Sequence, residues 1–148
     1  NKQVIKPEFK EYLLNRHYYP TPRVLAGQAL KGLASSAIDL SDGLVSDLSH
    51  ILKASNVGAV IDANAIPLSS SLTESVGADQ ALAYALTGGE DYELLFTVPE
   101  SQRGAIDTAL LHAGVKFVKI GQICSGNKIK FTLDGQPFTP EFKGFEHF

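Results

Sequence analysis

The stretch SSAIDLSDGLVSDLSHILKAS, residues 35–55, predicts a strand, a short polar loop and a helix in immediate succession. The apolar run in SSAIDL is typical of a short buried strand. The remainder places apolar residues at helical spacing, which gives the helix one apolar face; these residues are Leu44, Leu48, Ile51 and Leu52. Asp39 and Asp42 bracket the loop between the two elements, and Asp47 lies within the helix.

Two interpretations of these acids remain open on the residues alone. In the first, Ser41 or Asp42 is the N-cap of the helix, because short polar side chains accept hydrogen bonds from free N–H groups there. In the second, Asp39 and Asp42 hold Mg²⁺, which takes oxygen ligands and bridges carboxylates to substrate phosphates. Gly43 would let the backbone approach a ligand closely. We interpret Asp47 as a solvated residue of the helix.

Outward from this stretch, helices and strands alternate through the middle of the chain and strands dominate its end. Helices are predicted over 8–18, 23–32, 41–55, 75–86 and 99–114, and strands over 35–40, 57–61, 91–99, 115–123 and 127–139. Asp134-Gly135 is a strong signal for a hairpin turn in the last of these. The pattern predicts an α/β protein of the α+β type, a mixed sheet with helices packed on it.

Composition narrows the possible classes of protein. The chain has 148 residues and a net charge of −3 without a basic cluster, so we expect no nucleic-acid partner. It has no apolar run of the ~20 residues that span a bilayer, so we expect no membrane partner. The single cysteine, Cys124, is interpreted as a structural thiol and suits a cytoplasmic location. The chain begins with Asn1 and contains no Met, so we expect a piece of a longer protein.

A second acidic motif, LTGGEDYELLF at residues 86–96, places Glu90 and Asp91 between a glycine pair and a strand. These acids would either line a cleft for a cationic ligand or simply face water. Near the C-terminus, Phe145 and Phe148 would either clamp a flat ring or pack on the protein's own core. None of the histidines has a metal-binding spacing or is given a role. They are His17, His50, His112 and, in the same tail, His147.

Three stretches together resemble a known family. They are SSAIDLSDGLVSDLSHILKASNVGAVIDANAIPLS (35–69), ALTGGEDYELLFTVPE (85–100) and KGFEHF (143–148). In order and spacing they are similar to the C-terminal half of the thiamine-monophosphate kinases, which belong to the aminoimidazole ribonucleotide synthetase-like superfamily. The first motif is shared across that superfamily, whereas the second is more specific to the kinases. The resemblance implies the C-terminal domain of the aminoimidazole ribonucleotide synthetase-like fold.

The resemblance also implies a reaction, in which ATP and thiamine monophosphate give ADP and thiamine diphosphate with Mg²⁺ as the cofactor. Asp39 and Asp42 would be Mg²⁺ ligands, with Asp42 the catalytic residue, and Ser41 would contact ATP. Glu90 would contact the thiamine moiety. Phe145 would pack on the thiamine rings, with Phe148 as the alternative, since a carboxylate and a phenyl ring suit an aromatic cation.

Residues 1–20 would then be a linker from an absent N-terminal domain, and residues 21–148 the C-terminal domain. The partners implied are that N-terminal domain and a second copy in a homodimer, and the isolated chain is expected to be inactive. One alternative is another ATP- and Mg²⁺-dependent enzyme of the superfamily, such as a purine-biosynthesis synthetase or selenophosphate synthetase. The others are a non-catalytic nucleotide- or thiamine-binding module, and a domain whose acids are merely caps.

Overall fold

The computed structural model describes residues 5–89 and 92–140. The helices are α1 (Pro7–Tyr18), α2 (Val24–Leu30), α3 (Leu44–Ser55), α4 (Ser70–Val76), α5 (Ala78–Thr87) and α6 (Arg103–His112). The strands are β1 (Ser36–Asp39), β2 (Gly58–Asp62), β3 (Leu94–Thr97), β4 (Gly121–Cys124), β5 (Ile129–Leu133) and β6 (Gln136–Phe138). Short 3₁₀ turns follow β2 (Ala63–Ala65) and precede α6 (Glu100–Gln102).

The strands form two sheets. The larger has the order β4-β2-β5-β6, in which β2 runs parallel to β5 and the other pairs are antiparallel. β5 and β6 are joined by Asp134 and Gly135 at φ 51° and 74°, which confirms the predicted hairpin turn. The smaller sheet is an antiparallel ribbon of β1 and β3, with Ser36 opposite Thr97 and Asp39 opposite Leu94. The prediction of an α/β protein with a mixed sheet is therefore confirmed, with the β1–β3 ribbon as an addition.

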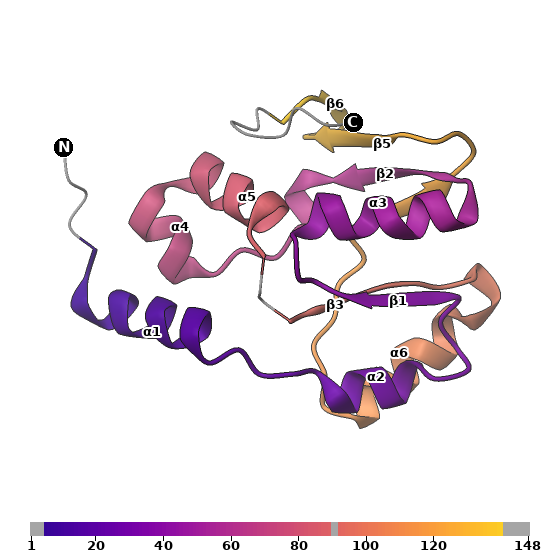
Figure 1. Ribbon diagram of the computed structural model, residues 1–148, viewed down its shortest axis with the longest axis horizontal. Helices are drawn as coiled ribbons and strands as arrows, with labels where there is room; N and C mark the ends of the chain where they lie inside the picture. The colour runs from indigo at the N-terminus through magenta and orange to yellow at the C-terminus, as the bar shows by residue number, and fades with distance from the viewer. Residues whose placement is uncertain (1–4, 90–91, 141–148) are drawn as a thin grey trace.

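The ribbon lies between two apolar clusters. In Figure 1, α3 and the four-stranded sheet are on one side of β1 and β3, and α2 and α6 are on the other. Because side chains alternate along a strand, Leu95 joins the larger cluster under α3, while Leu94 and Phe96 pack against the cluster of α2 and α6. The two apolar clusters thus hold the ribbon between them, and with it the ends of β1 and β3 and the loops that adjoin these strands.

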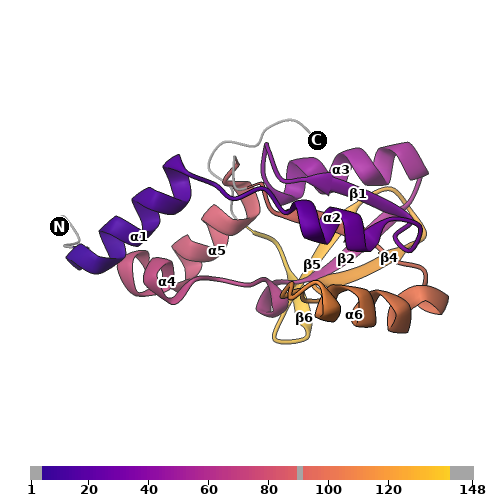
Figure 2. The same cartoon turned by 90° about the horizontal axis from the view of Figure 1, so that it is seen from below.

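Helix α1 lies apart from both clusters, alongside α4 and α5 (Figure 2). It has no buried residue and packs mainly against α4. Lys6, just before it, forms an exposed ion pair of 3.1 Å with Glu74 of α4. No helix in residues 5–89 or 92–140 has the length and apolar character needed to cross a membrane.

Three predicted elements differ from the structure. The helix expected over 75–86 is two helices, α4 and α5, because Gly77 interrupts it at φ 86°. The strand expected over 115–123 begins only at Gly121, since residues 115–120 cross from the α2–α6 cluster to the larger one. The buried strand expected over 91–99 is the shorter β3, in which Leu95 alone is buried and the other three residues are half-buried.

Candidate functional site

The acid loop, residues 39–43, connects the end of β1 to the start of α3. The backbone N–H of Leu40 donates to the carbonyl of Glu93 at 2.8 Å, and the N–H of Tyr92 donates to the carbonyl of Leu40 at 3.2 Å. These bonds extend the pairing of β1 and β3 into the loop. Asp39, Ser41 and Asp42 are all exposed there, so their oxygens are accessible to a ligand.

The acid loop touches the glycine pair of the second acidic motif through its backbone. Gly43 is buried at φ 107°, and a Cβ built there would lie 2.9 Å from the carbonyl group of Thr87. A Cβ at Gly89 would lie 2.2 Å from the carbonyl oxygen of Ser41. Figure 1 shows the start of α3 beside the end of α5, where these loops meet. The two motifs, which are far apart in the sequence, therefore form one region of the surface.

Three residues with predicted roles have no described placement. Glu90 falls between the two described ranges, and Phe145 and its alternative Phe148 fall after residue 140, so all three lie outside the described residues. The roles given to them remain predictions.

Asp47 is buried in the structure, whereas the sequence analysis placed it in solvent. Its side chain is 1% exposed, so the interpretation of a solvated residue is wrong. Its Oδ2 accepts hydrogen bonds from the backbone N–H groups of Ser41 at 2.9 Å and Asp42 at 3.1 Å. The N-cap of α3 is Gly43, which makes no side-chain cap, so the prediction of Ser41 or Asp42 at that position is also wrong.

A sequence signal for the buried carboxylate was present. Asp47 stands three residues after Leu44 and four before Ile51, on the apolar face of α3 rather than on its solvent face. A charged group in that position needs hydrogen-bond donors to offset its loss of hydration. The polar loop just before the helix supplies these donors.

His50, to which the sequence analysis gave no role, lies on the next turn of α3. Atoms that could ligate a metal lie within 4.8 Å of one another here: a carboxylate oxygen of Asp42, one of Asp47 and a ring nitrogen of His50. Asp47 and His50 are three residues apart in a helix, a spacing that places two side chains on one face. Because Mg²⁺ prefers oxygen ligands, the exposed carboxylates of Asp39 and Asp42 fit that ion better than the His50 ring does.

Glu93 joins the start of β3 to two other segments. Its carboxylate accepts hydrogen bonds from Arg16 Nη2 of α1 at 2.9 Å, and from both Nε and Nη2 of Arg23, the residue before α2. The Arg23 hydrogen bond is the main cause that lowers the pKa of Glu93, opposed by burial and assisted by Arg16. The same hydrogen bond raises the pKa of Arg23.

The residue before Glu93 in the sequence has an unusual backbone conformation. Tyr92 adopts φ 52°, in the left-handed region that residues other than glycine seldom occupy. Tyr92 and Glu93 are also the residues whose backbone pairs with Leu40. The arginines therefore hold in place the segment that leads from the second acidic motif into β3. Sequence analysis missed this role of Glu93, for which the only signal was an acid directly before the apolar run LLF.

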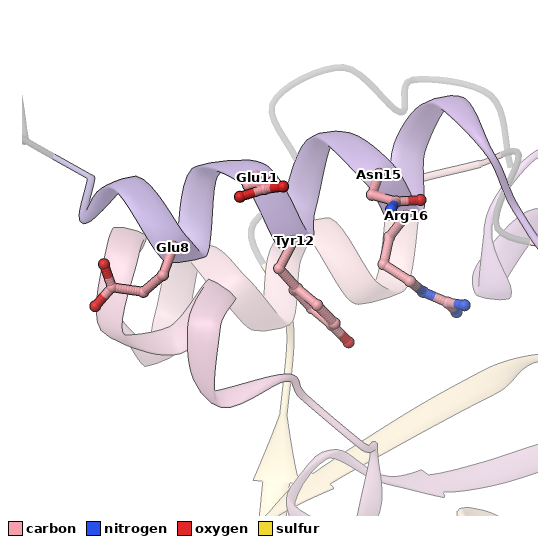
Figure 3. A pocket seen from close by; sticks show the side chains of 5 residues that line it. All are labelled: Glu8, Glu11, Tyr12, Asn15 and Arg16. Atoms are coloured by element: carbon pink, nitrogen blue, oxygen red, sulfur yellow. The ribbon is translucent and has the colours of Figure 1, made fainter.

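A shallow pocket lies along α1 rather than at the acid loop. Figure 3 shows its lining side chains, Glu8, Glu11, Tyr12, Asn15 and Arg16, all from that one helix. None of them belongs to the acid loop or the glycine pair. The region formed by residues 39–43, 87–89 and 92–93 remains the better candidate site.

Comparison with known proteins matches residues 7–134 to the family AIR synthase related protein, C-terminal domain. The thiamine-monophosphate kinase of Escherichia coli (strain K12) is 54% identical over 147 residues, which are 99% of this chain and 45% of that protein. The crystal structure of thiamine-monophosphate kinase from Stenotrophomonas maltophilia K279a gives a TM-score of 0.79 at 39% identity, over 92% of this chain and 43% of that one.

The structure of AaThiL complexed with AMPPCP and TMP gives a TM-score of 0.72 at 32% identity. That match covers 97% of this chain and 44% of the other. This chain thus spans about half the length of the curated relatives that it matches.

Proposed function

We propose that this chain, which belongs to the family of AIR synthase related proteins as their C-terminal domain, forms part of an ATP- and Mg²⁺-dependent thiamine-monophosphate kinase. The resemblance to the kinases seen in the three sequence stretches is confirmed by the identity to curated members. The expected fold is confirmed by the solved kinase structure. Because the chain spans about half of those relatives, the activity is proposed for the longer protein.

One observation of the structure supports this proposal most strongly. The superfamily-wide acid loop and the kinase-specific TGGEDYE motif meet through backbone contacts between Gly43 and Thr87 and between Gly89 and Ser41. Core packing of Leu44 of α3 and Leu86 of α5 brings these two helix ends together, and the close backbone approach at Gly43 and Gly89 places the acid loop against the second motif. Their convergence suits a reaction in which one loop handles phosphate and the neighbouring loop handles the acceptor substrate.

The acid loop carries groups suited to phosphoryl transfer. Transfer between two anionic phosphates depends mainly on positioning and on neutralisation of charge, and bound Mg²⁺ would supply that neutralisation. The exposed carboxylates of Asp39 and Asp42 would hold the ion, with Asp42 nearest the reaction. The exposed hydroxyl of Ser41 would contact ATP. A protein nucleophile is not needed, since the phosphate of thiamine monophosphate attacks directly.

The acceptor side is assigned by resemblance. Glu90 would face the thiazolium cation, and Phe145 or Phe148 would pack on the rings, with a cation–π contribution of about 0.5–2 kcal/mol. The solved relative AaThiL is complexed with AMPPCP and TMP, which supports an ATP site and a TMP site within this fold.

The remaining partners are also proposals. An N-terminal domain would precede this one, with residues 1–20 as the connecting segment and residues 21–148 as the C-terminal domain, and the full protein would be a cytoplasmic homodimer. The connecting segment contains α1, whose Arg16 binds Glu93, so it contacts the second acidic motif directly.

The test uses the full-length protein with Mg-ATP and thiamine monophosphate. Thiamine diphosphate is detected by the fluorescence of its oxidised product, and parallel reactions contain aminoimidazole precursors instead. We expect Mg-ATP to be consumed with thiamine monophosphate, giving thiamine diphosphate, and not with the aminoimidazole precursors. ATP consumption only with another substrate would favour a different enzyme of the superfamily, and ATP binding without consumption would favour a binding module.

The isolated chain 1–148 is assayed beside the full-length protein. We expect no turnover from it, because the relatives are about twice its length. Measurable turnover would contradict the view that the site needs a second domain.

A further inference from the structure

We propose that Asp47 is a positioning residue for the acid loop, whose buried carboxylate fixes the peptide units of Ser41 and Asp42 and so orients Asp39 and Asp42 toward Mg²⁺. This inference rests on the proposed kinase function. It concerns a residue that makes no contact with substrate in the proposal and acts only through the loop.

The geometry shows a single carboxylate oxygen holding two successive peptide units. Asp47 Oδ2 accepts from the N–H groups of Ser41 at 2.9 Å and Asp42 at 3.1 Å, and the whole side chain is 1% exposed. The N–H of Asp47 itself donates to the carbonyl of Gly43 at 2.9 Å. The loop is thus bound at three consecutive residues to one position of α3.

This arrangement separates the part of the loop that is fixed from the part that is available. The backbones of Ser41 and Asp42 turn inward to Asp47, whereas the side chains of Asp39, Ser41 and Asp42 are exposed. The two N–H groups are occupied, so neither is free to bind a phosphate of the substrate. An anionic substrate would therefore be reached through a cation on the exposed carboxylates, which agrees with the proposed role of Mg²⁺.

A buried charge is costly unless its hydrogen bonds are made, and an apolar residue at position 47 would remove the acceptor of the N–H groups of Ser41 and Asp42. The charge is therefore better explained by what it holds than by stability of the helix. Hydrogen bonds to an ionised acceptor are also roughly twice as strong as neutral ones. Asp47 also places a carboxylate beside Asp42, since one oxygen of each lies within 4.8 Å of the other.

Asp47→Asn is the direct test, because it keeps the size of the side chain but removes the charge and replaces one oxygen with a donor. Loss of a group that orients metal ligands typically weakens metal binding about 10–100-fold. We expect that loss for Mn²⁺, which replaces Mg²⁺ as an observable ion. Mn²⁺ binding to the full-length protein with ATP, and without thiamine monophosphate, is followed by electron paramagnetic resonance.

Two control variants separate positioning from general effects. Asp107→Asn makes the same chemical change at an exposed site on α6. Ile51→Val removes one buried methyl group from the same face of α3 and so lowers stability, while the carboxylate of Asp47 stays in place. Both should bind Mn²⁺ within about two-fold of the unaltered protein by this reasoning, since both leave the carboxylate of Asp47 and its hydrogen bonds to Ser41 and Asp42 in place.

A kinetic measurement adds a second readout. The Mg²⁺ concentration needed for half-maximal activity of Asp47→Asn should rise by the same factor as the Mn²⁺ dissociation constant, and excess Mg²⁺ should restore much of the rate. The KM for thiamine monophosphate should stay within about two-fold, because the metal loop rather than the acceptor site is loosened.

The outcomes are distinguishable. Unchanged Mn²⁺ affinity of Asp47→Asn, with lower thermal stability alone, would show that Asp47 is only structural and would overturn the inference. Failure of the unaltered protein to bind Mn²⁺ with ATP would overturn the proposed function itself, and the inference with it. If Asp47→Asn does not fold, Asp47→Glu keeps the charge but displaces the carboxylate by one methylene group, and unchanged Mn²⁺ affinity of that variant would equally overturn the inference.

Discussion

Gly89→Ala should separate the two loops of the candidate site. The added Cβ would lie 2.2 Å from the carbonyl oxygen of Ser41, 3.1 Å from its carbonyl carbon and 3.3 Å from Cα of Asp42. Side-chain Cβ atoms essentially never approach closer than 3.0 Å, so the loops must move apart by about 0.8 Å. Gly89 does not have a left-handed φ, so the effect is steric rather than conformational.

The size of the effect follows from this displacement. Introducing an atom into a close-packed contact costs about 1–3 kcal/mol of stability. A misplacement of about 1 Å among catalytic groups costs about 100-fold in rate. We therefore expect Gly89→Ala to remain folded in the full-length protein and to lose about 100-fold in kcat/KM for thiamine diphosphate formation.

The matched control is Gly104→Ala on α6. A Cβ there has no atom within 4 Å, and alanine in a helix is favoured over glycine by about 0.5–1 kcal/mol. This variant should keep full activity and equal or higher thermal stability. Normal activity of Gly89→Ala would refute the reasoning, because it would show that the contact between the two loops is not needed for the reaction.

Two further predictions concern Glu93 and Glu90. Glu93→Gln should lower the free energy of unfolding by about 1 kcal/mol or less at pH 7, as for partly exposed ion pairs. Arg23 and Arg16 lower the pKa of Glu93, so this difference in the free energy of unfolding should persist above the unfolded pKa of about 4.3 and disappear as the pH falls through the folded pKa. Urea unfolding at pH 7 and at acid pH measures the difference, and a value that does not change with pH would contradict the prediction. Glu90→Ala should raise the KM for thiamine monophosphate more than the KM for ATP in steady-state kinetics. A change in the KM for ATP alone would contradict the role proposed for Glu90.

The sequence was sufficient where local pattern and turn chemistry decide the structure. The apolar spacing from Leu44 to Leu52 predicted α3, and Asp134-Gly135 predicted the β5–β6 turn, because each depends on nearby residues. The strand, loop and helix around Asp39 and Asp42 followed for the same reason. The exposed placement of both carboxylates agrees with the predicted metal role, which the structure itself does not test.

Other features depend on contacts between distant segments. No local pattern in LTGGEDYELLF shows that Gly89 touches Ser41, or that Glu93 binds Arg16 and Arg23. Asp47 was misinterpreted because an acid in a helix usually faces water, although its position on the apolar face argued otherwise. The break at Gly77 was missed because the residues on both sides continue to favour a helix.

The most direct measurement for the central claim compares Asp42→Asn with Asp107→Asn in the full-length protein. Thiamine diphosphate formation is followed over a range of Mg²⁺ concentrations, with thermal unfolding measured in parallel. The account predicts that Asp42→Asn folds normally and loses Mg²⁺-dependent transfer, whereas Asp107→Asn is unaffected. Full activity of Asp42→Asn at ordinary Mg²⁺ concentrations would contradict the account and leave the acid loop without a catalytic role.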